Sequence, residues 1–372
     1  MEKEQNNETN EHATAKLPSA PWPAAFPLAS DYGRDVPESW LRKTAPVVLD
    51  LLLADRSTGC NIRWCTDDYV VRGEGFGFAD EITTDLICGS APVIRPRVDK
   101  REEEQKARVS SKGEVFTPAW VCNAQNNLVD RHWFCKFAPI FNTVDKTGRK
   151  WAPTTKSALW EIVRNNDKAR AYLSLVRMEV SCGEAPYLTS RYDASSGDTI
   201  KVANRVGLLD RKLRLVSDLA RDNKETWLSL ARTALRSLYA FDWQGDNVLL
   251  ARENLLFATL EAFATRWPDV RSVSLSVVED FASILSWNVF QMDGVKFVVP
   301  ETCHDVAQSV PELSLGAPPP APVRCPGCES GDYRLHNGVR PLVVDWTKSD
   351  FEPRAVPFHE LFPSVAQGGA TA

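Results

Sequence analysis

The sequence predicts an α/β fold built on a parallel sheet with helices on both faces. Three short apolar segments have the composition of buried strands, and each carries an acid at its carboxyl end: Glu179, Asp242 and Asp293. The segments between them place apolar residues at helical spacing. Strands that alternate with helices are typical of parallel sheets, because the chain must cross over before it can run in the same direction again.

The first part of the chain is predicted to contain an arm and a small module. Residues 1–30 are rich in Glu, Asn, Pro and Ala and lack a periodic apolar pattern, which predicts a disordered or loosely packed arm. Residues 31–108 are predicted to form an α+β module. Its expected elements are a helix at 40–53, strands at 61–69 and 73–78, and a charged surface helix or linker at 99–111.

Residues 109–300 are predicted to form the main domain. Near its start, Thr117 can cap a helix whose first turn holds Pro118. The amide side chains on that helix are Asn123, Gln125, Asn126 and Asn127; they can line a cofactor or nucleic-acid pocket, but an amide-rich helix face is usually solvated, so we expect them to lie in solvent. The predicted helices lie at 119–133, 157–165, 206–220, 228–238, 246–263 and 277–287, and the predicted strands at 173–180, 237–243 and 288–292.

Residues 301–372 are predicted to form a proline-rich loop and a tail, with one strand at 339–345. The loop carries Cys325 and Cys328 in a C-x-x-C pair, and two thiolates at this spacing can bind one tetrahedral zinc ion. Cys303 or His304, together with His336, can supply the other two ligands. The predicted metal ligands are therefore Cys303, Cys325, Cys328 and His336, and the alternative is a pair of reduced cysteines in a loop.

The composition sets limits on partners and compartment. A net charge of −5 argues against a protein that coats nucleic acid without selectivity, since such binding needs many basic residues. Two basic clusters, at 95–112 and at Lys146, Arg149, Lys150 and Lys156, leave room for a local groove or for ordinary solvated surface. Nine cysteines and the absence of a stretch of about 18 apolar residues predict a cytoplasmic protein with reduced thiols and no membrane segment.

Four motifs, taken in order, resemble a known family. They are Val115-Phe116-Thr117-Pro118, the segment from Glu179 to Leu188, Phe241-Asp242 followed by Ala251-Arg252-Glu253-Asn254-Leu255, and the segment from Asn288 to Gly294. This order resembles the adenine-N6 DNA methyltransferases of restriction-modification systems, the M subunits of type I systems and the fused type IIG enzymes. The resemblance implies a Rossmann-like, S-adenosylmethionine-dependent methyltransferase sheet over residues 109–300, with DNA as a partner.

The resemblance also implies roles for individual residues. Phe116, Thr117 and Pro118 correspond to the F-x-T-P element, which in the family contacts the methionine part of the cofactor. Asp242 corresponds to the acid that binds the ribose hydroxyls, and Asp293 to the acid that faces the adenine amino group. Glu179, Cys182 and Gly183 belong to the strand and turn that cradle the cofactor.

The chain departs from the family pattern in three respects. Glu179 and Asp242 are separated by 63 residues, more than one crossover needs, so a helical pair inserted at 206–238 must be accommodated. Ala185 stands where the family has its second glycine, which leaves less room beside the cofactor, and Val180 stands where it has proline. The catalytic tetrapeptide (N/D)-P-P-(Y/F/W) does not occur in the sequence. We therefore expect a split enzyme, whose second subunit carries that tetrapeptide and completes the site for the flipped base. The alternative is a non-catalytic DNA-binding or assembly subunit with a degenerate methyltransferase fold, stabilised by zinc.

Overall fold

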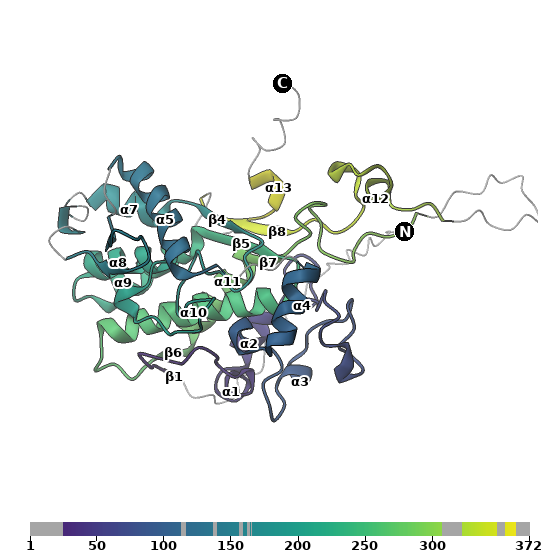
Figure 1. Cartoon of the computed structure of the whole chain (residues 1–372), viewed down its shortest axis with the longest axis horizontal. Coiled ribbons are helices and arrows are strands. Elements are labelled where there is room, and N and C mark those ends of the chain that lie inside the picture. The colour runs from purple at the N-terminus through teal and green to yellow at the C-terminus, as the bar shows by residue number, and fades with distance from the viewer. Residues whose placement is uncertain are drawn as a thin grey trace, which may run out of the picture.

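A parallel sheet of three strands, in the order β4–β5–β7, lies at the centre of the fold (Figure 1). The strands are β4 (Arg177–Val180), β5 (Leu238–Asp242) and β7 (Val289–Gln291). Val180 pairs with Phe241, which in turn pairs with Phe290. The three strands therefore run in the same direction, and their carboxyl ends lie at the same end of the sheet. The computed structural model describes residues 25–112, 117–136, 140–155, 159–161, 164, 166–306, 322–347 and 354–361.

Helices cover one face of this sheet. Alternate strand residues Leu238, Ala240 and Val289 point into a large apolar core that the helices share. The helix α10 crosses this core and is buried almost along its whole length. The helices of this region are α5 (Ala119–Phe134), α7 (Asn166–Ser174), α8 (Leu208–Ala220), α9 (Lys224–Arg236), α10 (Gly245–Arg266) and α11 (Leu275–Asn288).

The opposite face of the sheet has a different cover. Tyr239, Phe241 and Phe290 point away from the helices and form a second apolar cluster with Val343 and Phe358. These last two residues belong to an antiparallel hairpin and to a one-turn helix, so the prediction of helical layers on both faces is wrong for the described residues. The covering elements are β8 (Leu342–Asp345), β9 (Arg354–Pro357) and α13 (Phe358–Leu361).

The regular elements in the first described part of the chain are nearly all helices, and this part shares the core of the sheet region. The predicted helix at 40–53 is two helices, because Pro46 starts a new one. The predicted strands at 61–69 and 73–78 are wrong: only isolated bridges form there, such as Arg63 with Glu81. The elements are β1 (Ala25–Pro27), α1 (Glu38–Thr44), α2 (Pro46–Leu53), η1 (Val70–Arg72), α3 (Thr84–Ile87), η2 (Arg97–Asp99) and α4 (Glu102–Lys112).

Smaller elements complete the described chain. Within the arm predicted for residues 1–30, Phe26 lies in β1, is fully buried and pairs with Val273 of β6. The predicted helix at 157–165 and residues 1–24 lie largely or wholly outside the described residues. The remaining elements are β2 (Asn142–Val144), β3 (Trp151–Pro153), η3 (Val202–Asn204), β6 (Ser272–Ser274), α12 (Pro326–Ser330) and η4 (Tyr333–Leu335).

A search of the described residues for a membrane-crossing helix found no helix with the necessary length and apolar character.

Candidate functional site

The acids predicted at the strand ends gather at the carboxyl edge of the sheet. Glu179 is the next-to-last residue of β4, Asp242 ends β5, and Asp293 follows β7 by two residues. Because the three strands are parallel neighbours, their carboxyl ends lie side by side. Ligands of open α/β sheets bind at this edge.

Glu179 is buried and held by the loop that follows its own strand. Its two carboxylate oxygens accept hydrogen bonds from the backbone N–H groups of Tyr187, at 3.3 Å, and Leu188, at 3.1 Å. Burial raises the pKa of Glu179 to about 8, the nearby Asp242 adds to the rise, and the two N–H groups oppose it. The loop therefore orients this carboxyl group but brings no positively charged side chain to it.

Asp242 joins the turn after β4 to the turn after β5. Its carboxylate accepts hydrogen bonds from the N–H of Gly183 at 2.8 Å, the N–H of Gln244 at 3.0 Å and the Asn247 side chain at 3.2 Å. Burial raises the pKa of this carboxyl group above its ordinary value, although these three donors lower it. Asp242 thus fixes the shape of the edge around Gly183.

Glu179 and Asp242 have no basic side chain as a partner among the described residues. By contrast, Asp246, in the first turn of α10, pairs with the Lys100 Nζ at 3.1 Å and the Arg108 Nη2 at 2.6 Å. Although burial acts to raise the pKa of Asp246, Arg108 and Lys100 hold it well below its usual range. The sheet edge therefore carries two buried acids that the described residues do not pair with a basic side chain.

Asp293 is engaged in its own turn. Its Oδ1 accepts hydrogen bonds from the N–H groups of Val295, at 2.9 Å, and Lys296, at 3.0 Å, and its side chain is almost fully buried. The Lys296 Nζ lies 3.6 Å from Oδ2. This carboxylate shapes the turn after β7 and is less available to a ligand than the other two acids.

The turn after β4 uses backbone conformations that favour glycine. Ser181, Gly183 and Ala185 have φ of +51°, +53° and +60°. Ala185 therefore keeps the glycine-like conformation of the family motif although its side chain is fully buried. Cys182 points into the helical core, so only its backbone faces the turn, where its N–H donates to the carbonyl of Phe241 at 2.9 Å.

The F-x-T-P segment is described only in part. Phe116 lies outside the described residues, and Thr117 and Pro118 precede α5. The predicted cap is displaced by one residue, because Pro118 itself is the N-cap and α5 starts at Ala119. The Thr117 side chain lies beside the phenol of Tyr187, whose backbone N–H binds Glu179. The start of α5 and the loop after β4 are therefore neighbours.

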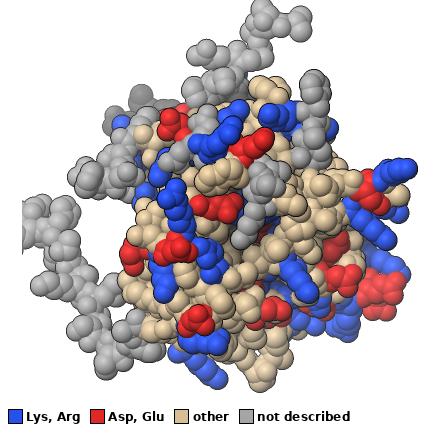
Figure 2. All heavy atoms as spheres, turned by 90° about the vertical axis from the view of Figure 1, so that its left-hand side faces the viewer, with Lys and Arg blue, Asp and Glu red and all other residues tan. Residues whose placement is uncertain are grey.

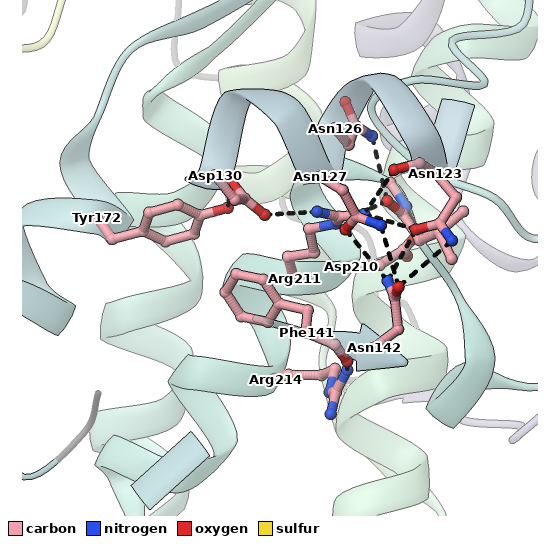
Figure 3. Close-up of polar contacts among 12 residues, drawn as sticks. Asn123, Asn126, Asn127, Asp130, Phe141, Asn142, Tyr172, Asp210, Arg211 and Arg214 are labelled. Carbon is pink, nitrogen blue, oxygen red and sulfur yellow. Dashed lines mark hydrogen bonds and ion pairs between the residues drawn. The ribbon is translucent and has the colours of Figure 1, made fainter. Parts of the chain in front are cut away.

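A buried polar network holds α5 in this position, as Figure 3 shows. Arg211 of α8 is fully buried and binds Asp130 and the Asn123 Oδ1 of α5. Asn142 of β2 exchanges side-chain hydrogen bonds with Asn123 and with Asn127, at 2.7 Å and 3.1 Å for the shortest contacts. The expectation that these amides lie in solvent is therefore wrong.

Asn126 extends the network to the sheet edge. Its side-chain amide donates to the carbonyl of Tyr187 at 3.0 Å and to the carbonyl of Val206 at 3.1 Å. It therefore ties α5 directly to the loop whose N–H groups hold Glu179. Sequence spacing alone does not reveal this role, because the acceptors are backbone carbonyls far along the chain.

A second site lies at the predicted zinc ligands. The ligand atoms of Cys303, Cys325, Cys328 and His336 all lie within 4.8 Å of one another. The His336 Nδ1 is 3.5 Å, 3.7 Å and 3.6 Å from the three sulfur atoms in that order. One nitrogen and three sulfurs at these separations form a possible metal-binding group of the Cys3His type. His304, the alternative to Cys303, stays outside this group.

Two glycines, Gly327 and Gly338, allow the backbone to pass close to the residues of the cluster. A Cβ at Gly327 would lie 2.4 Å from the backbone nitrogen of His336, and one at Gly338 would lie 3.1 Å from the Cys303 sulfur. The N–H of Asn337 donates to the Cys325 sulfur at 3.4 Å. Against the effect of burial, the N–H groups of Asn337 and Cys328 lower the pKa of Cys325 to about 6. Pro326 and Gly327, between the two cysteines, lie in the short helix α12 (Pro326–Ser330).

The cluster is attached to the sheet edge through Arg340. Its guanidinium donates to the carbonyls of Lys296 and Phe297, at 3.2 Å and 3.0 Å, and to the carbonyl of Tyr333 at 2.7 Å. Lys296 and Phe297 belong to the turn that Asp293 shapes, whereas Tyr333 lies between the cysteine pair and His336. The metal-binding group therefore braces one side of the candidate ligand edge.

The two basic clusters do not form a simple positive surface. Lys100 and Arg108, from the first cluster, are buried in their pairs with Asp246. On the side of the molecule that carries α7, α8 and α9, basic and acidic side chains are interspersed (Figure 2). This face therefore does not offer a broad patch of one charge.

In comparisons with known proteins, the chain matches no protein-family model, no curated protein and no solved structure.

Proposed function

We propose that this chain is the S-adenosylmethionine-binding M component of a DNA adenine-N6 methyltransferase, belonging to a restriction-modification or related defence system. The motifs suggest the family, and the sheet edge supplies the physical support. The main observation is that Glu179 and Asp242, on adjacent parallel strands, are buried and lack a basic partner among the described residues.

The charge of the sheet edge suits this ligand. S-adenosylmethionine carries positive charge on its sulfonium and ammonium groups, and buried carboxylates without a partner favour a cation. The remaining acceptor positions also fit, since a carboxylate has about four and Asp242 uses three, while Glu179 uses two. Glu179 would then face the methionine part and Asp242 the ribose, with Thr117 beside them.

The chain's own residues would bind and orient the cofactor, which supplies the methyl group. The base-side half of the reaction needs acceptors for the amine protons and an aromatic ring for the flipped base. Because the (N/D)-P-P-(Y/F/W) tetrapeptide is absent from the sequence, we assign these groups to a second subunit that acts with this chain on DNA. The alternative, a non-catalytic DNA-binding or assembly subunit, differs in that no methyl transfer would follow when the subunits are combined.

Isothermal titration calorimetry with S-adenosylmethionine tests the cofactor site. We expect the wild-type chain to bind, and Glu179→Gln and Asp242→Asn each to weaken binding by about tenfold or more, which corresponds to loss of one charged hydrogen bond. Asp222→Asn is the matched control, because this acid is exposed and far along the chain. Absence of binding by folded wild-type protein, alone and with its partner subunit, would refute the proposal.

We further propose that the Cys3His cluster binds Zn²⁺ in a structural role. Four protein ligands fill a tetrahedral shell and leave no open position for catalysis. The bond from the Asn337 N–H to the Cys325 sulfur is the kind of outer contact that orients a thiolate ligand.

Elemental analysis of the purified chain tests the zinc site. We expect about one zinc per chain, and loss of the metal in Cys328→Ser, because three ligands bind zinc less tightly than four. Cys135→Ser is the control, since Cys135 is an exposed cysteine outside the cluster. Cobalt substitution adds an optical test, as tetrahedral thiolate coordination gives intense visible absorption. A full complement of zinc in Cys328→Ser would contradict this ligand set.

A further inference from the structure

The strand β4 forms an open edge of the sheet. It pairs with β5 on one side, and within the described residues its other side has no strand partner. The Arg177 N–H donates to the carbonyl of Ser237, beside β5. Because backbone groups alternate in direction along a parallel strand, those of Met178 and Val180 point away from β5. An edge of this kind is a template for another strand.

Burial across the sheet falls away toward this edge. Phe290, Phe241 and Val180 occupy one row of paired residues on the hairpin-covered face. Phe290 is 2% exposed and Phe241 is 5% exposed, whereas Val180 is 61% exposed. The cover given by β8, β9 and α13 reaches β7 and β5 and stops before the end of β4. The row of apolar side chains therefore extends to Val180, which the hairpin and α13 leave exposed.

The winding of the chain explains where the missing cover would come from. The order β4–β5–β7 advances in one direction, and the helices of both crossovers lie on one face. A doubly wound sheet continues beyond its first strand, in the opposite direction, with its helices on the other face. Parallel sheets are normally buried on both faces. The described chain therefore has the content of one half of such a sheet.

We propose that the outer edge of β4 pairs in parallel with a strand of a second, different protein chain. A helix of that chain would cover Val180 on the face where the hairpin stops. The occupant is thus a chain with an unpaired parallel strand and an apolar helix, which completes the sheet on the far side of β4. Its identity as the base-side subunit rests on the proposed function, whereas the strand pairing rests on the edge alone.

The position of this edge has a consequence for the ligand site. In doubly wound sheets the ligand crevice opens between the first strands of the two halves, at their carboxyl ends. Glu179 lies at this end of β4, next to Val180. A strand added to β4 would therefore form the other wall of the crevice and place the second chain's residues beside the cofactor position.

Site-specific cross-linking identifies the occupant. The full-length chain, carrying a photoreactive phenylalanine derivative in place of Val180, is irradiated in its source cells, and the cross-linked product is analysed by mass spectrometry. We expect one product, to a different protein, which is then purified and mixed with the chain. A cross-link to a second copy, a cross-link within the chain, or no cross-link would each overturn the proposal.

Hydrogen exchange on the purified pair tests strand pairing itself. We expect the Met178 and Val180 amides to exchange at least about tenfold more slowly in the complex than in the free chain, because they gain backbone acceptors. Val180→Lys should weaken the complex by about tenfold or more, through the loss of apolar contact. Val71→Lys is the matched control, since Val71 is 93% exposed and lies in η1.

The outcomes separate this inference from the proposed function. Unchanged exchange at Met178 and Val180 in a stable complex would overturn strand pairing, whatever the calorimetry with S-adenosylmethionine shows. Slowed exchange in a complex that does not bind S-adenosylmethionine would leave the pairing in place and refute the cofactor proposal.

Discussion

Glu179 shows how one residue can be fixed in place and still be unstable as an anion. The N–H groups of Tyr187 and Leu188 orient its carboxylate, but burial and the neighbouring Asp242 raise its pKa to about 8. In the free protein the group therefore holds a proton through most of the neutral range. A cationic ligand would displace that proton and lower the pKa of this carboxyl group.

The raised pKa of Glu179 predicts a pH-dependent stability. Between the ordinary value of 4.5 and about 8, the folded chain binds a proton that the unfolded chain releases. The free energy of unfolding should therefore fall as pH rises through this window, by up to about 1.4 kcal/mol per pH unit. Urea denaturation of the wild type and of Glu179→Gln at several pH values measures it.

The comparison with Glu179→Gln isolates this residue from other buried acids. The stability of the variant should fall less steeply with pH than that of the wild type over the same range. Parallel curves for the two proteins would mean that Glu179 titrates near its ordinary pKa in the folded chain.

At the scale of elements, α5 is positioned by buried polar contacts as well as by apolar packing. Arg211 and Asp130 form a fully buried ion pair between α8 and α5, and the Tyr172 hydroxyl of α7 donates to the same Asp130 at 2.7 Å. Asn126 then fixes α5 to the loop after β4. Because such contacts are directional, they set the position of α5 more narrowly than apolar contacts do.

Breaking the buried pair predicts a large loss of stability. Asp130→Ala leaves the Arg211 guanidinium buried without its anion, which should cost about 3–5 kcal/mol of unfolding free energy. Asp222→Ala is the matched control, because it removes an exposed acid that pairs with Arg266, an interaction worth at most about 1 kcal/mol. Chemical denaturation measures both, and equal effects would contradict the role given to the buried pair.

At the scale of the whole molecule, the metal-binding group and the sheet are joined by few contacts. Arg340 and the hydrogen bond from the Val299 N–H to the carbonyl of Val339, at 2.8 Å, connect the cysteine-bearing segments to the turn after β7. The main apolar core, in contrast, runs from Phe26 to Val289 and includes none of the metal-binding residues. The four residues of this group therefore lie outside the main apolar core.

Metal removal is expected to loosen one region only. When a chelator removes the proposed metal, the amides of residues 299–306 and 322–340 should exchange at least about tenfold faster, since these residues lie outside the main apolar core. The amides of β5 should keep their protection. Hydrogen exchange with mass spectrometry measures both regions, and a general loss of protection would show that the metal supports the entire fold.

Local patterns in the sequence predicted those strands and helices that depend mainly on residues close together in the chain. The strands β4, β5 and β7 lie where the pattern places strands, with Glu179, Asp242 and Asp293 at or just beyond their carboxyl ends, since a short apolar run followed by an acid and a turn is a local signal. The helix at 119–133 and the Cys325–Cys328 pair are also local signals, whereas the choice between Cys303 and His304 depends on the fold. The alternation of residue types at 61–69 and 73–78 wrongly predicted strands, because this region forms only isolated bridges.

The sequence by itself determined the order of the three parallel strands and their connecting helices, the acids at the strand ends and the Cys325–Cys328 pair. These depend on residue type and spacing. Only the tertiary structure decided that Asn123 and Asn127 are buried, that Glu179 and Asp242 lack a basic partner among the described residues, and that β4 is an open edge. The physical reason is that burial, charge compensation and strand pairing are set by segments that are distant in the chain and meet only when it folds.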